Sequence, residues 1–190
     1  SAALNGNQAT NAGVLCGTYS VGPTGIYPTL TAALNDLRLQ GASCNVILEL
    51  QAAYTSGAET FPIWTGAVGN GAASVVTVRP ELGATGLVIS STNVLGTVLD
   101  SLTNYVNFDG RPGGLGTTSE LTITNLNNTA TATIAALRIT QESSNNSHSY
   151  IVFRGNSTST TGGVVVISGS TGGSGNDNNS FDNCDFRDPG

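Results

Sequence analysis

The sequence predicts an all-β protein, a right-handed parallel β-helix (a solenoid) with an N-terminal capping α-helix. Three observations lead to this prediction. Few residues are charged, strand-like segments run from residue 46 to the end without alternating helices, and some of these segments resemble one another. We therefore expect an N-terminal segment with the capping helix at residues 1–45 and β-helix coils at residues 46–190.

The composition favours an ordered β protein with an uncharged polar surface. Charged residues make up 9% of the 190 residues, whereas soluble domains typically contain about 25%. Disordered chains combine low hydrophobicity with high charge. Here 38% of the residues are hydrophobic, which argues against disorder. Ser, Thr, Asn and Gly take the places that charged residues usually fill.

A single segment, Thr29–Gln40, has the pattern of an α-helix. Thr29 suits the N-cap and Gly41 follows where helices commonly end. The segment carries one apolar stripe at helical spacing, formed by Leu30, Ala33, Leu34 and Leu37. Because an open solenoid end exposes strand edges and core, we expect this helix to cover the N-terminal end.

Everything after Asn45 reads as short strands separated by Gly, Asn, Ser and Thr. The absence of alternating helices excludes a doubly wound α/β fold. The expected strands are Val46–Leu50, Val75–Arg79, Leu87–Ser90, Val98–Leu102, Tyr105–Asp109, Leu121–Asn125, Ala135–Thr140, Tyr150–Arg154, Val164–Ser168 and Asn183–Arg187.

Internal similarity predicts how the coils stack. Residues 145–155 (NNSHSYIVFRG) align with residues 178–188 (NNSFDNCDFRD), and residues 105–111 (YVNFDGR) align with residues 150–156 (YIVFRGN). The gaps leave room for three strands per coil, and the Asn pairs would sit at turns and hydrogen-bond from coil to coil. This register predicts two core columns, one of Val106, Ile151 and Cys184 and one of Phe108, Phe153 and Phe186.

The odd number of cysteines leaves at least one thiol free or in an intermolecular bond. Cys16 and Cys44 flank the predicted helix, and a disulfide between them could close a loop over it. Cys184 lies in an apolar strand pattern, so we expect a small buried core residue.

Several segments resemble the start of large Bacteroidota surface proteins that contain a pectin-lyase-like β-helix. The segments are CGTYSVG (16–22), YPTLTAAL (27–34), GASCNV (41–46), YVNFDGRPGG (105–114) and GNDNN (175–179). The resemblance extends from about Cys16 to the end of the chain. It implies a right-handed parallel β-helix in a large exported protein, of the kind secreted by the type IX system and regarded as adhesins. It also implies that Cys16 and Cys44 pair, and it implies no catalysis because the likeness lies in scaffold residues.

Charge and hydropathy narrow the partners and the location. The net charge is −6 and the six arginines are scattered, so we expect no nucleic acid partner. No run approaches the roughly 18 apolar residues of a membrane span, so we expect no membrane insertion. The chain starts at Ser1, which fits either a removed signal peptide or a boundary within a longer chain. We expect a secreted or cell-surface protein.

We expect no catalytic, cofactor or metal site. His148 is the only histidine, and the alignment places it opposite Phe181 in the next copy, so a structural role is favoured over acid–base or zinc chemistry. Asp177, Asp182 and Asp185 offer oxygen ligands for Ca²⁺, but the segment matches no known calcium loop and turn chemistry explains it equally well. Trp64 could stack on a sugar, although a packed coil edge is favoured.

A polysaccharide-active enzyme is the main rival. Its chemistry needs carboxylates and basic residues on the outer face of neighbouring coils. The alignment supplies Asp109, Arg154 and Arg187 at equivalent positions, with Arg111 and Asp188 nearby. The favoured interpretation is a ladder of surface ion pairs between coils.

Three functional hypotheses follow. The first is a rigid stalk or adhesin on the cell surface, with surface polysaccharide as a further partner. The second is a filament subunit, because the chain stops after the strand Asn183–Arg187 without a second cap, and another copy or further coils would cover that end. The third is the N-terminal part of a polysaccharide lyase or hydrolase.

Overall fold

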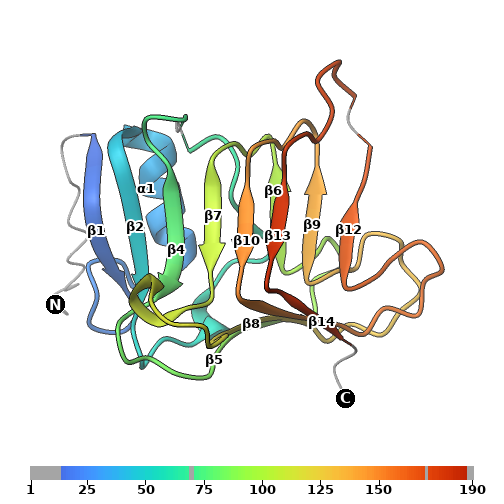
Figure 1. Ribbon diagram of the computed structural model, residues 1–190. Helices are drawn as coiled ribbons and strands as arrows, with labels where there is room; N and C mark the ends of the chain where they lie inside the picture. Colours follow the sequence, from blue (N-terminus) through green and yellow to red (C-terminus); the bar gives the residue numbers. More distant parts are fainter. Residues whose placement is uncertain (1–13, 69–70, 170, 188–190) are drawn as a thin grey trace, which may run out of the picture.

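The computed structural model describes residues 14–68, 71–169 and 171–187 and forms a parallel β-solenoid (Figure 1). The strands belong to three sheets in which every neighbouring pair is parallel. Each complete coil passes through one strand of each sheet, as in β4–β5–β6, β7–β8–β9 and β10–β11–β12. The all-β parallel solenoid predicted from the sequence is confirmed.

Sheet A is the longest of the three and runs along one side of the stack, as Figure 1 shows from left to right. Its strands are β1 (Leu15–Val21), β2 (Ala42–Leu50), β4 (Val76–Pro80), β7 (Val106–Asp109), β10 (Ser147–Ser149) and β13 (Ser180–Asp182). The sequence pattern missed β1 and the first residues of β2, where polar and apolar residues do not alternate cleanly. It also missed the three-residue strands β10 and β13, which end just before the left-handed corner residues Tyr150 and Asn183.

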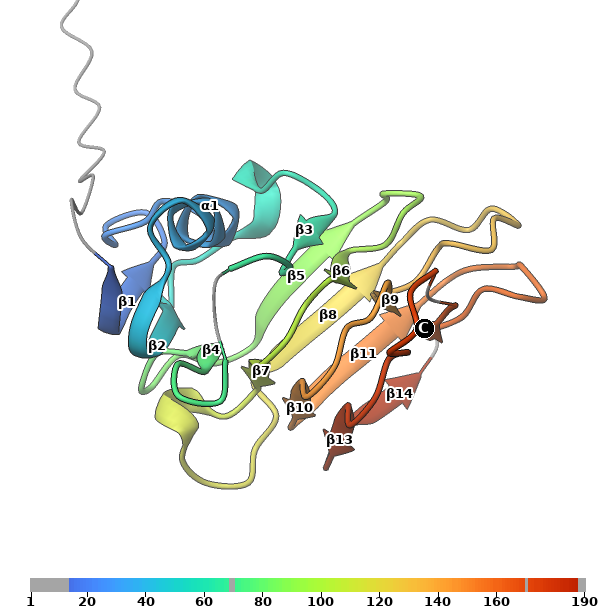
Figure 2. The same ribbon diagram turned by 90° about the horizontal axis from the view of Figure 1, so that it is seen from above.

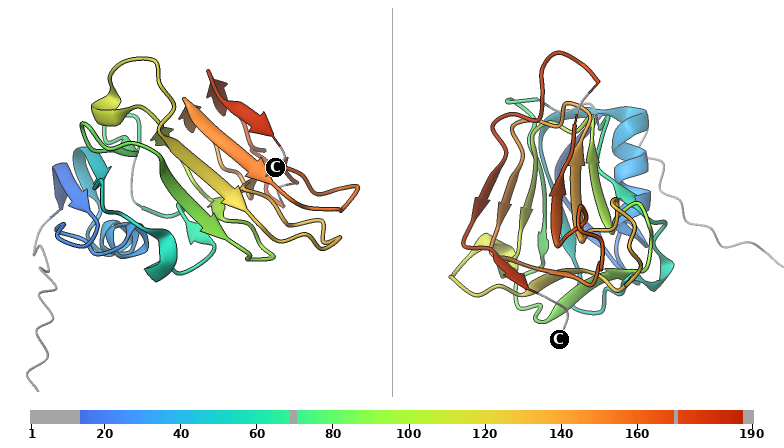
Figure 3. Two further views of the ribbon diagram at one scale, coloured as in Figure 1. Left: turned by 90° about the horizontal axis from the view of Figure 1, so that it is seen from below. Right: turned by 90° about the vertical axis from the view of Figure 1, so that its right-hand side faces the viewer.

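Sheets B and C form the other two sides, which Figures 2 and 3 show from further directions. Sheet B contains β3 (Ile63–Trp64), β6 (Val98–Ser101), β9 (Leu137–Thr140) and β12 (Val165–Ile167). Sheet C contains β5 (Leu87–Ser91), β8 (Leu121–Asn125), β11 (Ile151–Gly155) and β14 (Asp185–Arg187). Two 3₁₀ turns lie in the connections, η1 (Ser56–Ala58) and η2 (Pro112–Gly114).

The helix α1 (Leu30–Gln40) forms where the sequence predicts it. The Thr29 hydroxyl accepts a hydrogen bond from the amide of Ala32 (3.0 Å), and the Gly41 amide donates to the Leu37 carbonyl (2.8 Å). The four residues of the predicted apolar stripe are buried. The helix packs against β1, β2 and β3, so it closes the side of the first coil that sheet B forms in later coils (Figure 2).

Coil length varies while strand register is kept. Val46, Val76 and Val106 lie opposite one another in sheet A at intervals of 30 residues. From Phe108 to His148 the interval is 40 residues, and from His148 to Phe181 it is 33. Connections between strands absorb the difference, since an inward residue must meet an inward residue in the next coil.

Of the two sequence alignments, the one with an offset of 33 residues is confirmed. It pairs Phe153 with Phe186 in sheet C and His148 with Phe181 in sheet A. The Asn pairs also act as predicted, because Asn179 Oδ1 accepts a hydrogen bond from the amide of Asn146 (3.2 Å) in the preceding coil.

The alignment of residues 105–111 with residues 150–156 is wrong. Val106 and Phe108 belong to sheet A, whereas Ile151 and Phe153 belong to sheet C, so the predicted columns do not form across these two copies. The partner of Phe108 in the next coil is His148. The error has a physical cause: Tyr105 (φ 56°) and Tyr150 (φ 53°) are both left-handed corner residues ahead of a strand. The same local pattern therefore begins strands of two different sheets.

Candidate functional site

A buried polar cluster lies inside the solenoid around His148. The imidazole projects inward from β10, with Nε2 3.2 Å from Oδ2 of Asp100 on β6, and both side chains are 1% exposed. Phe108 and Phe181 stack on either side of the imidazole, with ring centroids 5.8 and 5.1 Å away. The histidine therefore takes part in an aromatic column of the core, and a solute reaches it only if coils separate.

Hydroxyl groups complete this cluster across several coils. Thr65 Oγ1 donates to Asp100 Oδ1 (2.5 Å) and lies 2.9 Å from the hydroxyl of Thr103. The backbone amide of Thr103 donates to Ser143 Oγ (3.1 Å), and its carbonyl accepts from the Asn146 side-chain amide (2.9 Å). Sequence reasoning missed the cluster, because Asp100 and His148 lie far apart in the chain and in different sheets.

Of the charged residues considered for catalysis, Arg111 binds Asp109, whereas Arg154 and Arg187 lie in a different sheet from Asp109. Asp109 lies opposite Ser149, whereas Arg154 lies opposite Thr124 and Arg187 in sheet C. The predicted equivalence of Asp109 with the two arginines is therefore wrong, although Arg154 and Arg187 are equivalent. Asp188 lies outside the described residues.

The ion pairs on the outside join neighbours in the chain or in the sheet. Arg111 binds Asp109 through two hydrogen bonds (2.9 and 2.8 Å), and its guanidinium lies 4.7 Å from the ring centre of Tyr150. The hydrogen bonds with Asp109 raise the pKa of Arg111. Between coils, Arg79 binds Glu49 at 3.0 and 2.7 Å. This last pair is the kind of inter-coil contact that the sequence predicts.

The three aspartates considered for Ca²⁺ do not converge. Asp182 ends β13, and Asp185 on β14 pairs with Arg187. Within residues 14–68, 71–169 and 171–187, no group of three or more His, Cys, Asp or Glu side chains is arranged to hold a metal ion.

The first coils are fastened to α1 by Glu59. Its carboxylate accepts hydrogen bonds from the amides of Leu30 (2.6 Å) and Thr31 (2.8 Å) at the start of the helix, and from the hydroxyl of Tyr54 (2.8 Å). A carboxylate is favourable there because helix N-termini carry unpaired N–H groups and partial positive charge. Burial, followed by the charge of Glu59, strongly raises the pKa of Tyr54.

The other end of α1 is held by β3 and the residues after it. Arg38 donates to the carbonyl of Gly66 (2.9 Å) and lies over the ring of Trp64, 4.4 Å from its centre. The Trp64 indole donates to the carbonyl of Ser101 (2.7 Å) in the next coil. Trp64 therefore packs at a coil edge, the arrangement that the sequence analysis favoured over a sugar platform.

Two cysteines pair and the third remains a thiol. Cys16 on β1 and Cys44 on β2 form a disulfide, with Cα atoms 5.0 Å apart, that closes a loop containing α1. Cys184 is half-buried and its thiol donates to the carbonyl of His148 (3.3 Å). Burial raises the pKa of this thiol.

The C-terminal end presents core residues to the surface. Phe186 stacks on Phe153 at 5.5 Å but is 48% exposed, whereas Phe153 is fully buried. Ile167 on β12 is 58% exposed. Among the described residues no further strand pairs with β12, β13 or β14 on this side.

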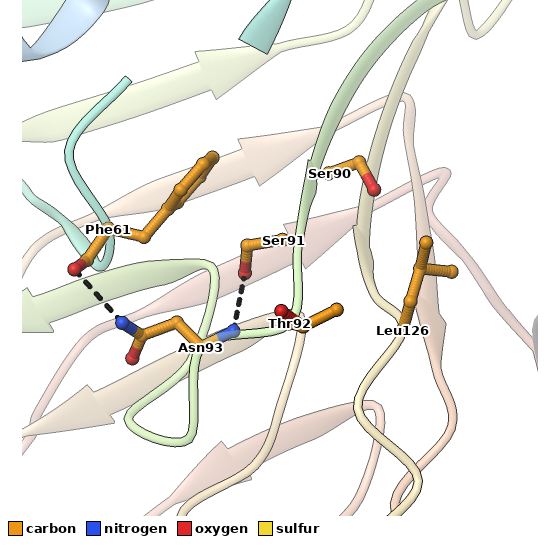
Figure 4. Close-up of a pocket in the computed structure, with 6 residues that line it drawn as sticks. All are labelled: Phe61, Ser90, Ser91, Thr92, Asn93 and Leu126. Atoms are coloured by element: carbon orange, nitrogen blue, oxygen red, sulfur yellow. Dashed lines mark hydrogen bonds between the residues drawn. The ribbon is translucent and has the colours of Figure 1, made fainter. Parts of the chain in front are cut away.

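A groove opens on the surface where sheet C leads into sheet B (Figure 4). Its volume is about 410 Å³ and it is lined by Phe61, Ser90, Ser91, Thr92, Asn93 and Leu126. The Asn93 side chain donates to the carbonyl of Phe61 (3.0 Å), which joins two neighbouring coils along the groove. No sequence pattern indicated the groove, since its residues come from three segments that lie far apart in the chain.

Comparisons with known proteins add no family to this description. No family model matches the chain, and neither a curated protein nor a solved structure matches it. In the part of the chain that the structure describes, no helix is both long and apolar enough to span a membrane.

Proposed function

We propose that the chain is a non-catalytic structural and adhesive segment of a secreted cell-surface protein, in which the solenoid acts as a rigid stalk. The observation that carries the proposal is the way coils are joined. Apolar residues form a continuous core, and side-chain amides and hydroxyls bond one coil to the next. A solenoid whose neighbouring repeats are all joined in this way resists bending.

The chemistry of the reactive side chains supports this proposal over an enzyme. The single imidazole is enclosed in the core beside Asp100. The carboxylate of Asp109 is held by Arg111, and that of Glu59 binds the start of α1. Each of these groups has a structural partner that a substrate would have to displace.

The disulfide and the composition support an extracellular location. Disulfides persist in oxidising compartments and are rare in the cytosol, and Cys16–Cys44 links the first two strands of sheet A. The resemblance to Bacteroidota surface proteins makes export by the type IX system part of this proposal. Protease treatment of intact producing cells tests the location. We expect the protein to be cleaved with the membrane intact, and protection until lysis would contradict the proposal.

The proposal of a non-catalytic role is tested with acidic and neutral polysaccharides. We expect the purified chain to release neither reducing ends nor unsaturated sugars from any of them. Activity that is lost in Asp109→Ala, with an unchanged circular dichroism spectrum, would instead support the polysaccharide lyase or hydrolase.

The C-terminal end favours a second candidate function, a subunit of an extracellular filament. The exposed Phe186 and Ile167 lie at the end of the core, beside the free edges of β12, β13 and β14. Another copy or further coils would bury these residues and pair these edges. Electron microscopy of the native material tests this: filaments with a solenoid repeat support it, and isolated short particles contradict it.

A further inference from the structure

The groove in Figure 4 is built by three consecutive coils at one corner of the solenoid. Phe61 comes from the connection before β3, and Leu126 directly follows β8. Residues 90–93 run from the end of β5 into the corner between them. In Figure 4, Phe61 and Leu126 lie on opposite sides of this middle segment.

We propose that this groove binds a neutral saccharide. The inference rests on the proposed adhesive role and names the class of ligand for it. None of the six lining residues is charged. Phe61 and Leu126 offer apolar surface for the C–H face of a sugar ring, while Ser90 and Thr92 offer hydroxyls for its edge. A uronic acid would find no cation among the lining residues.

The Asn93 side chain of the groove is hydrogen-bonded within the protein, and two hydroxyls remain for a ligand. Asn93 is occupied, because its Nδ2 donates to Phe61 (3.0 Å) and its Oδ1 accepts from the amide of Leu95 (2.8 Å). No hydrogen bond joins the Ser90 or Thr92 hydroxyl to another described residue. These two hydroxyls are therefore available to a sugar.

The groove is held in place before any ligand arrives. Asn125 donates from its side chain to the carbonyl of Asn93 (2.9 Å), and Asn127 does the same to the carbonyl of Thr92 (2.9 Å). These bonds tie the middle segment to the next coil, so binding requires little ordering of the chain.

A hydroxyl next to the groove lacks a partner. Thr124 lies opposite Ser90 in the register of β5 and β8, is 6% exposed, and its Oγ1 makes no hydrogen bond. Buried polar groups are usually satisfied by protein, water or ligand. The Thr124 hydroxyl is buried and Thr124 does not line the groove, so it offers no contact to a ligand there.

The test measures binding of the purified full chain to hexasaccharides by saturation-transfer NMR and calorimetry. The probes are neutral xylan, glucan, mannan and galactan fragments and an acidic galacturonate fragment. We expect at least one neutral probe to bind, with affinity reduced about tenfold or more in Phe61→Ala and a few-fold in Thr92→Ala. Leu115→Ala, an exposed substitution in another loop, is the matched control and should leave binding unchanged.

Each outcome decides the inference. Binding of a neutral probe that weakens in Thr92→Ala but not in Leu115→Ala supports the saccharide site. Because Thr92 is exposed, the Thr92→Ala variant keeps the fold even if Phe61→Ala does not. Binding of the acidic probe alone, no binding at all, or equal binding by Thr92→Ala and wild type overturns it. Failure here leaves the stalk proposal standing, because that proposal depends on surface location and lack of hydrolysis.

Discussion

The core of the solenoid is covered at its N-terminal end and partly exposed at its C-terminal end. At the N-terminal side, inward residues such as Leu48 and Val78 are fully buried, α1 covers the core, and the disulfide and Glu59 fasten the helix to the strands. At the C-terminal side the core becomes aromatic, and its last ring, Phe186, is 48% exposed. A solenoid needs covered ends, so the comparison indicates that stability within this chain rises toward the N-terminus.

The two regions also differ in polarity. The interior near β10 contains the His148–Asp100 pair, whereas the interior near β2 and β4 is formed by aliphatic side chains. In the following coil the residues opposite the pair are apolar, since Phe181 lies opposite His148 and Ile139 lies opposite Asp100. Apolar residues therefore fit both positions of the fold. The pair distinguishes the observed stacking register of this coil from similar alternative registers.

The largest difference in stability is expected between two Phe→Ala substitutions, one at a buried ring and one at a half-exposed ring. Phe153→Ala opens a cavity in a fully buried position and should lower the free energy of unfolding by about 3–5 kcal/mol. Phe186→Ala should cost about 1 kcal/mol or less, since half of its surface is already in water. Urea unfolding of both variants measures the difference. Equal losses would mean that the C-terminal end is covered in solution.

The disulfide should contribute almost as much at the other end. Replacing Cys16 and Cys44 by Ser frees a loop of 28 residues and should reduce stability by about 3–4 kcal/mol, through the entropy of the unfolded chain. Cys184→Ser is the matched control, with a loss below about 1 kcal/mol because that thiol is only half-buried. Thermal unfolding with and without reductant measures both. If reduction leaves the melting temperature unchanged, the N-terminal coils do not depend on this link.

Replacing His148 by Phe should cost about 1–3 kcal/mol, because it leaves Asp100 Oδ2 buried without its polar neighbour, while Oδ1 keeps the hydroxyl of Thr65. The ring itself suits the column, as Phe181 shows one coil further on. Adding Asp100→Ile, the residue type found opposite it, should restore most of the loss. A double-mutant cycle measures the coupling. Additive losses would show that the two side chains do not act as a pair.

How far the sequence predicts this molecule depends on whether a feature is local. The helix at residues 30–40 and the 33-residue repeat follow from patterns within one segment, namely an apolar stripe and matched Asn and Phe positions. The register of Phe108 does not, because corner residues such as Tyr105 and Tyr150 introduce strands of both sheets A and C. The Asp100–His148 pair and the groove near Phe61 arise only when unequal coils are stacked. Spacing along the chain gives no signal for them.

A smaller effect is expected at the start of α1. Glu59→Gln keeps the shape of the side chain but removes the charge that faces the helix N-terminus and one of the acceptors used by Leu30, Thr31 and Tyr54. We expect a loss of about 1–2 kcal/mol. Glu81→Gln, which affects one backbone contact to Ala52, is the control with a loss below about 0.5 kcal/mol. Hydrogen exchange should locate the loosening in α1. An effect spread evenly over all coils would contradict this assignment.

The smallest expected effect is a loss of stability in alkaline solution, which concerns the N-terminal coils and is absent at neutral pH. Burial raises the pKa of Tyr54 and of Tyr27, and the nearby carboxylates of Glu59 and Asp36 add to these shifts. A group with a raised folded-state pKa stabilises the fold below its unfolded value and loses that contribution as the pH rises above it, here about 10. Alkaline solution should therefore destabilise the N-terminal coils, where both tyrosines lie, and Tyr54→Phe should flatten the decline. Melting temperatures at rising pH, read together with tyrosinate absorbance, measure this. A decline of equal slope in Tyr54→Phe would assign the alkaline sensitivity to groups outside the first coils.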